Sequence, residues 1–86
     1  MLEIFLYCDL NGVVLSVRGT TIGDDLDSLL SAIDRLATES SVTVDLSGVA
    51  AMSHDEVLLV EGTVEWHRNG GAEISLLRPA GRLAAA

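Results

Sequence analysis

The chain has 86 residues, of which 13 are acidic and 5 are basic, and its formal net charge is −8. It contains no lysine, which argues against nucleic acid as a partner, because that affinity comes largely from lysine and arginine neutralising phosphates. It argues equally against docking on anionic lipid. Hydrophobic residues make up 49% of the chain, more than a disordered acidic segment contains. We therefore expect one compact domain over residues 1–86.

Cys8 is the only cysteine, so no intramolecular disulfide can form. The N-terminal residues lack the basic region of a signal peptide, and no apolar run approaches the ~20 residues that cross a bilayer. We expect a cytoplasmic protein that does not insert into a membrane. Cys8 ends an apolar strand and has no base or cation beside it, which is typical of a buried free thiol rather than a nucleophile.

Two strands joined by a tight turn are expected at the start of the chain. Alternating apolar residues predict strands over residues 2–8 and 13–18. Between them, Asn11 and Gly12 give a strong hairpin signal, because both residue types accept the positive φ of a type I′ turn. The chain is therefore predicted to begin with a β-hairpin.

An amphipathic helix is expected after the hairpin. Asp24 or Asp25 is placed to cap its start, and acidic residues in a first turn suit the helix dipole. Apolar residues then recur at helical spacing, at Leu26, Leu29, Leu30, Ile33, Leu36 and Ala37. This pattern predicts a helix that ends near residues 39–41 and has one face to bury.

The second half of the chain repeats the alternation of strand and helix. A short strand over residues 42–46 follows the first helix and is expected to pair in parallel with an earlier strand. Ser53 then begins a second helix, and Glu56 stands three residues later, at the capping-box spacing. That helix is expected to run to about Arg68, before a last strand over residues 72–77.

The order of elements is therefore ββαβαβ. Two helices with single apolar faces need a sheet to cover. We expect an α/β fold with a small mixed four-stranded sheet and both helices packed on it.

Residues 44–49 read Val-Asp-Leu-Ser-Gly-Val, and a short apolar connection, a helix ending in Asn-Gly-Gly at residues 69–71, and an apolar strand follow them. This run resembles the STAS domain, the family that includes the anti-sigma factor antagonists. The resemblance covers roughly residues 2–80, and the hairpin start and Gly19 agree with it. The family usually continues into a full helix after the last strand, so the domain is expected to be shortened at its C-terminus.

The resemblance implies a partner-switching module of bacterial transcription regulation with no enzymatic activity and no cofactor. In the antagonists, the unphosphorylated domain binds an anti-sigma factor that is also a serine kinase. Phosphorylation at the start of the second helix blocks this binding.

The motif at that helix start departs from the family. The family has Asp-Ser-Ser/Thr-Gly-Leu, whereas residues 53–57 read Ser-His-Asp-Glu-Val. On this alignment His54 takes the place of the phosphorylated serine, and a one-residue slip would make Ser53 the acceptor. The family often has Gly-Glu-Leu-Asp after the second strand, where residues 19–22 read Gly-Thr-Thr-Ile. We therefore expect binding without the standard serine phosphoswitch.

Two interpretations of the changed motif stay open. Asp55 and Glu56 already place negative charge in the first helical turn, where a helix N-terminus favours a phosphate. The domain is then either fixed in a phospho-mimicking state or has lost the switch and binds constitutively. Ser53 is explained by helix capping alone. His54 is explained by a solvent-facing position, with a phosphohistidine or a pH switch as its alternatives.

The expected partner-binding surface is the start of the second helix. It comprises Met52, Ser53, His54, Asp55 and Glu56, joined by Thr20 and Thr21 if the strands end at one edge of the sheet.

On the second helix, Val57, Val60 and Val64 form the expected core stripe. Trp66 lies on a second stripe with Leu59 and Thr63, and it either flanks the core or anchors a partner. No metal site is expected, since His54 and His67 lie at opposite ends of one helix. Nor is a catalytic triad expected, since Ser53, His54 and Asp55 are adjacent on one helix and cannot converge.

These observations predict a non-enzymatic module that binds a protein partner, of the anti-sigma factor and kinase type. Two other functions stay open. One is a STAS-like accessory subunit of a transporter ATPase complex, which binds constitutively. The other is a self-assembling structural module, for which a homodimer is the simplest form.

Overall fold

The computed structural model describes residues 2–10, 12–20 and 22–79. The order ββαβαβ is confirmed, with one short 3₁₀ turn, η1, before the first helix. The shortened C-terminus expected from the sequence involves residues 80–86, which lie outside the described residues. The elements are β1 (Leu2–Asp9), β2 (Gly12–Gly19), η1 (Gly23–Asp25), α1 (Leu26–Ala37), β3 (Val42–Val49), α2 (His54–Asn69) and β4 (Ile74–Leu77).

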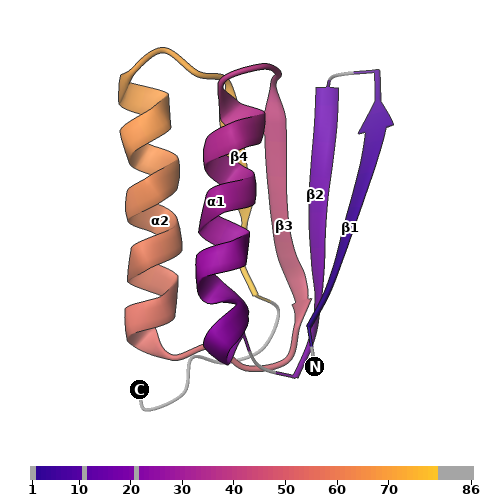
Figure 1. Cartoon of the computed structure of the whole chain (residues 1–86), viewed down its shortest axis with the longest axis vertical. Coiled ribbons are helices and arrows are strands. Elements are labelled where there is room, and N and C mark those ends of the chain that lie inside the picture. Colours follow the sequence, from indigo (N-terminus) through magenta and orange to yellow (C-terminus); the bar gives the residue numbers. More distant parts are fainter. Residues whose placement is uncertain (1, 11, 21, 80–86) are drawn as a thin grey trace.

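The strands form one mixed sheet in the order β1-β2-β3-β4. β1 and β2 pair antiparallel, and β2 and β3 pair in parallel, as the sequence predicted. β3 and β4 also pair in parallel. Figure 1 shows α1 and α2 side by side on the β3 and β4 side of the molecule, and β1 at the far edge. The helices therefore cover β2, β3 and β4 on one face and leave β1 uncovered.

The core lies between the two helices and the strands they cover. Leu15 and Val17 of β2 and alternate residues of β3 are buried against the helices. The apolar stripes predicted for both helices are confirmed, since their central residues are buried. The helix side of the core consists of Leu29, Ile33, Ala37, Val57, Val60 and Val64.

The turn prediction for Gly12 is wrong. Asp9 pairs with Gly12, so Gly12 begins β2 instead of lying in the turn, and Asn11 lies outside the described residues. Gly12 has a φ of 137°, and a Cβ atom there would lie 2.4 Å from the carbonyl oxygen of Ser41. Glycine is needed at this position because the chain entering β3 passes directly over it.

The start of α1 also differs from the prediction. Asp24 and Asp25 lie in η1, and Asp25 is the N-cap residue of α1, but its side chain makes no capping hydrogen bond. A 3₁₀ turn that leads into a helix already supplies backbone hydrogen bonds. The position of the helix was therefore predicted correctly, and the capping role of the aspartates was not.

The prediction that Cys8 is buried is wrong, because its side chain is exposed. Ile4 and Leu6 pair with the buried Val17 and Leu15, so they lie on the helix side of the sheet. They are nevertheless 39% and 58% exposed, since neither helix reaches β1.

Candidate partner-binding site

The loop after β2 and the connection after β3 lie side by side. The N–H of Ala50 donates to the carbonyl of Gly19 at 2.9 Å, and the N–H of Ala51 donates to that of Thr20 at 3.0 Å. β2 and β3 are parallel, so their C-terminal ends meet at one edge of the sheet. The predicted proximity of Thr20 to the start of α2 is confirmed, while Thr21 lies outside the described residues.

The capping box at the start of α2 is present. The Ser53 hydroxyl accepts the N–H of Glu56 at 3.2 Å, and Oε1 of Glu56 accepts the N–H of Ser53 at 2.9 Å. Two backbone donors that the helix leaves unpaired are thereby satisfied. Ser53 therefore acts as a helix cap, as its spacing predicted.

Glu56 has a second role that the sequence pattern does not predict. Its other carboxylate oxygen, Oε2, accepts the N–H of Gly23 at 3.0 Å. The carboxylate thus ties the loop after β2 to the first turn of α2. No local signal in the sequence links residues 33 positions apart, so this contact could be found only in the folded chain.

The prediction that Met52 belongs to the partner-binding surface is wrong. Its side chain is 1% exposed and packs in the hydrophobic core. Met52 comes directly before Ser53, where the chain turns from the end of β3 into α2. The apolar side chain therefore fixes the connection to the core, and the polar residues that follow it are the ones exposed at the surface.

Four described residues of the expected site present exposed side chains, and we name them the α2-start surface: Thr20, Ser53, His54 and Asp55. His54 and Asp55 occupy the first two positions of α2. Asp24 and Asp25 in η1 add exposed acidic residues beside Gly23, which Glu56 binds. This end of the molecule is therefore acidic, and it is suited to bind hydrogen-bond donors and basic side chains.

Trp66 lies at the opposite end of α2 from this surface. It lies twelve positions after His54, about 18 Å along the axis at the 1.5 Å rise of an α-helix. Its side chain is 73% exposed, so it flanks the core at most by its edge. The structure does not bring Trp66 together with the α2-start surface.

His67, next to Trp66, joins the two helices. Its ring lies edge-on to the Trp66 ring, with centroids 4.9 Å apart. Its Nε2 atom hydrogen-bonds to the Asp34 carboxylate at 2.7 Å, and the His67 side chain is buried. His67 is thus a structural link between α1 and α2, which its position on the sequence alone did not indicate.

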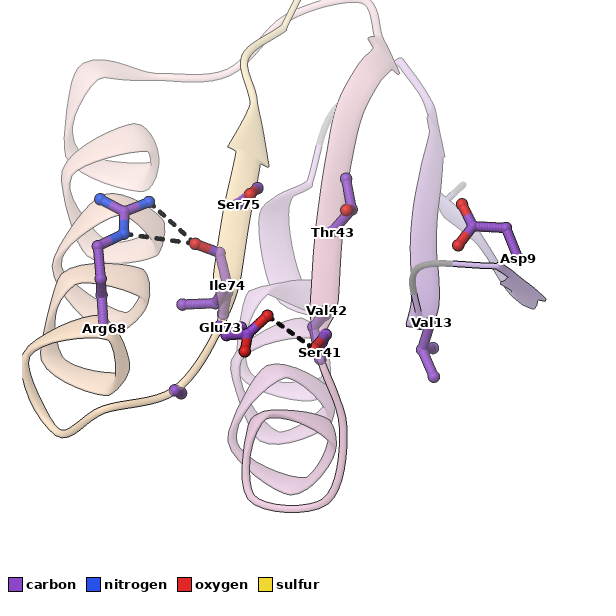
Figure 2. A pocket seen from close by; sticks show the side chains of 11 residues that line it. Asp9, Val13, Ser41, Val42, Thr43, Arg68, Glu73, Ile74 and Ser75 are labelled. Atoms are coloured by element: carbon purple, nitrogen blue, oxygen red, sulfur yellow. Dashed lines mark hydrogen bonds between the residues drawn. The ribbon is translucent and has the colours of Figure 1, made fainter.

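A hollow of about 480 Å³ lies at the opposite end of the strands from the α2-start surface, where the parallel strands begin. Figure 2 shows Arg68 reaching from α2 toward β4, with Nε and Nη2 donating to the carbonyl of Ile74 at 3.3 and 3.1 Å. The Ser41 hydroxyl donates to the Glu73 carboxylate at 3.3 Å across the same hollow. None of the residues expected to bind a partner lines it.

Within residues 2–10, 12–20 and 22–79, no group of three or more histidine, cysteine, aspartate or glutamate side chains is placed to hold a metal ion. In the same part of the chain, no helix has both the length and the apolar character needed to span a bilayer.

Comparison with known proteins bears on the fold. No family model matches the sequence, and no curated protein matches it. The structure is similar to the crystal structure of an antisigma-factor antagonist, a STAS domain from Rhodobacter sphaeroides. The TM-score is 0.64 at 20% sequence identity, over 88% of this chain and 85% of that chain. The expected STAS-like fold is therefore confirmed.

Proposed function

We propose that this chain is a regulatory protein-interaction module that binds an anti-sigma factor or a related serine kinase through the α2-start surface. The proposal rests on the separate roles of the residues at this helix start. Ser53 and Glu56 hold the backbone in place, and His54 and Asp55 face solvent. Under this proposal the chain is a single-domain, cytoplasmic, bacterial regulator of transcription and not an enzyme.

We further propose that the module binds without a serine phosphoswitch. His54 stands where the resemblance expects the phosphorylated serine. The hydroxyl of Ser53, the residue that a one-residue slip would make the acceptor, already accepts the N–H of Glu56. A phosphate on Ser53 would add about −1.5 to −2 charges beside the Glu56 carboxylate, which accepts the N–H of Ser53, and the two negative groups would repel each other.

Reversing the charge of Asp55 is expected to weaken partner binding at least tenfold, about 1.4 kcal/mol. Asp55 is exposed in the first turn of α2, and an arginine there would oppose the basic partner surface that this acidic end attracts. The measurement is the affinity of the purified Asp55→Arg chain, compared with the unchanged chain, for a regulatory kinase first captured from native extract. The bait is weighed intact to detect any added phosphate.

The matched control is Glu39→Arg, which makes the same charge reversal at an exposed position after the C-terminal end of α1. It is expected to leave the affinity unchanged. Glu56→Arg would be a poor probe, because it would break the tie to Gly23 as well as change the charge. If Asp55→Arg and Glu39→Arg bind the kinase equally well, the proposed binding through the α2-start surface fails. If the bait carries phosphate on Ser53, the proposed absence of a serine phosphoswitch fails.

A transporter ATPase accessory subunit is the second candidate, and the exposure of Trp66 favours it. Trp66 is 73% exposed near the end of α2. Tryptophan is among the residue types that are enriched at binding hot spots. Trp66→Ala is then expected to reduce binding of a captured ATPase subunit at least tenfold and to change the unfolding free energy by less than about 1 kcal/mol. Calorimetric titration with that subunit measures the first effect, and capture of a regulatory kinase instead of an ATPase subunit rejects this candidate.

A further inference from the structure

The outer edge of β1 has no strand beside it in the described structure. β1 is the first strand of the sheet and pairs only with β2, over eight consecutive residue pairs without a bulge. Figure 1 shows no helix or strand along its outer side. Between Glu3 and Asp9 the strand carries no charge and no proline. It therefore lacks the devices by which natural proteins protect an edge strand from pairing.

Both faces of this strand are apolar and exposed. Ile4 and Leu6 on the helix side are 39% and 58% exposed, and Phe5 and Tyr7 on the other side are 44% and 51% exposed. Phe5 lies beneath the Arg18 guanidinium, 5.7 Å from its ring centroid, so its position on the open face is held. The edge thus combines unused backbone hydrogen-bonding groups with side chains that prefer to be covered.

We propose that two copies of this chain associate by antiparallel pairing of β1 with β1 of the second copy, which makes one continuous eight-stranded sheet. A two-fold axis perpendicular to the sheet relates the copies, so each surface patch meets itself. The same axis keeps the helices of both copies on one face of the sheet. Side chains directly opposite each other then come from the same face, so their residue numbers sum to an even number.

Strand length and charge together select the register among these even sums. Within β1, a sum of 10 pairs residues 2–8 of both copies and a sum of 12 pairs residues 3–9, and every other even sum pairs fewer residues. A sum of 10 places Phe5 opposite Phe5, Ile4 opposite Leu6 and Glu3 opposite Tyr7 of the second copy. A sum of 12 places Glu3 opposite Asp9 twice, and like charges directly opposite destabilise a strand pair. The register centred on Phe5 is therefore the one proposed.

A second copy fits this edge because the apolar centre of the strand, residues 4–7, is complementary to itself in this register, while Glu3 and Asp9 near its ends are not placed directly opposite each other. The net charge of −8 on each copy opposes association over longer distances. Salt screens such repulsion, so association is expected to strengthen as ionic strength rises. α2 lies at the far side of the molecule from β1, so the pairing leaves the α2-start surface open and does not depend on the proposed function.

Leu6→Lys is expected to weaken self-association of the full chain at least tenfold, because it places a charge at the centre of the paired edge. Analytical ultracentrifugation over a range of concentrations measures the effect. The matched control is Leu59→Lys, which adds the same charge at a leucine of α2 that is 52% exposed. Each variant lowers the net negative charge by one, so a loss seen only for Leu6→Lys is not an effect of overall charge.

Cross-linking tests the register. In a Cys8→Ser background, Phe5→Cys places two thiols directly opposite each other, within the 4.4–6.8 Å Cα separation of disulfides. Leu6→Cys places each thiol opposite Ile4 of the second copy, so the two thiols are diagonal neighbours and lie farther apart. Phe5→Cys is expected to form a dimer rapidly on mild oxidation, and Leu6→Cys slowly. The reverse order overturns the register, and a chain that stays monomeric at about 1 mM and high salt overturns the proposal. Circular dichroism confirms that each variant is folded.

Discussion

Truncation of Met52 to alanine is expected to lower the free energy of unfolding by about 2–5 kcal/mol. The side chain is 1% exposed and packs among the core residues that join the end of β3 to α2. Alanine would leave a cavity that the surrounding side chains fill only in part. In a domain of this size, whose total stability is on the order of 5–15 kcal/mol, this loss is a large fraction of the whole.

Urea denaturation followed by circular dichroism measures this effect, and Leu58→Ala provides the control. Leu58 is 51% exposed on α2, so its truncation removes little buried surface. If Met52→Ala proves as mild as Leu58→Ala, Met52 does not lie in the core, and its assignment to the partner-binding surface would be restored.

Replacement of Glu56 by alanine is expected to lower the free energy of unfolding by about 2 kcal/mol. The carboxylate accepts two backbone N–H groups, from Ser53 and Gly23, and alanine leaves both without this acceptor. Since 1 kcal/mol shifts the Tm of such a domain by roughly 4–8 °C, the Tm is expected to fall by roughly 8–16 °C. The loop after β2 also loses its tie to α2.

Hydrogen exchange distinguishes this local effect from a general loss of stability. In Glu56→Ala the amides of Gly23 and Ser53 are expected to exchange faster than those of neighbouring residues. The control is Asp55→Ala, in the same helical turn, where both amides keep their acceptor and the stability changes by less than about 0.5 kcal/mol. Equal exchange at Gly23 in the two variants would contradict the role assigned to Glu56.

The helix start of α2 illustrates which part of the site was predictable. The capping box joins residues three positions apart, and the helix geometry alone brings them together. The bond from Gly23 to Glu56 joins the same carboxylate to a loop 33 residues away. It exists because β2 and β3 run in parallel and end at one edge, and only the assembled sheet determines how closely their loops approach.

The burial of side chains on β1 was also predictable only in part. Alternation correctly predicted that Ile4, Leu6 and Cys8 share one face of the strand, and the pairing with β2 places Ile4 and Leu6 on the face of its buried residues. It did not predict that this face stays open, and the burial expected for Cys8 was therefore wrong. Periodicity reports which side chains share a face. The lengths and positions of the packed helices determine how much of that face is covered.

The order ββαβαβ, the core stripes of α1 and α2, and the cap at Ser53 were all predictable from the amino-acid sequence, because each follows from spacing over a few residues. The burial of Met52, the bond from Glu56 to the loop after β2, and the open edge of β1 became known only from the folded chain. These properties depend on how elements distant in sequence pack against one another, and the pattern within any one element contains no information about its neighbours in space.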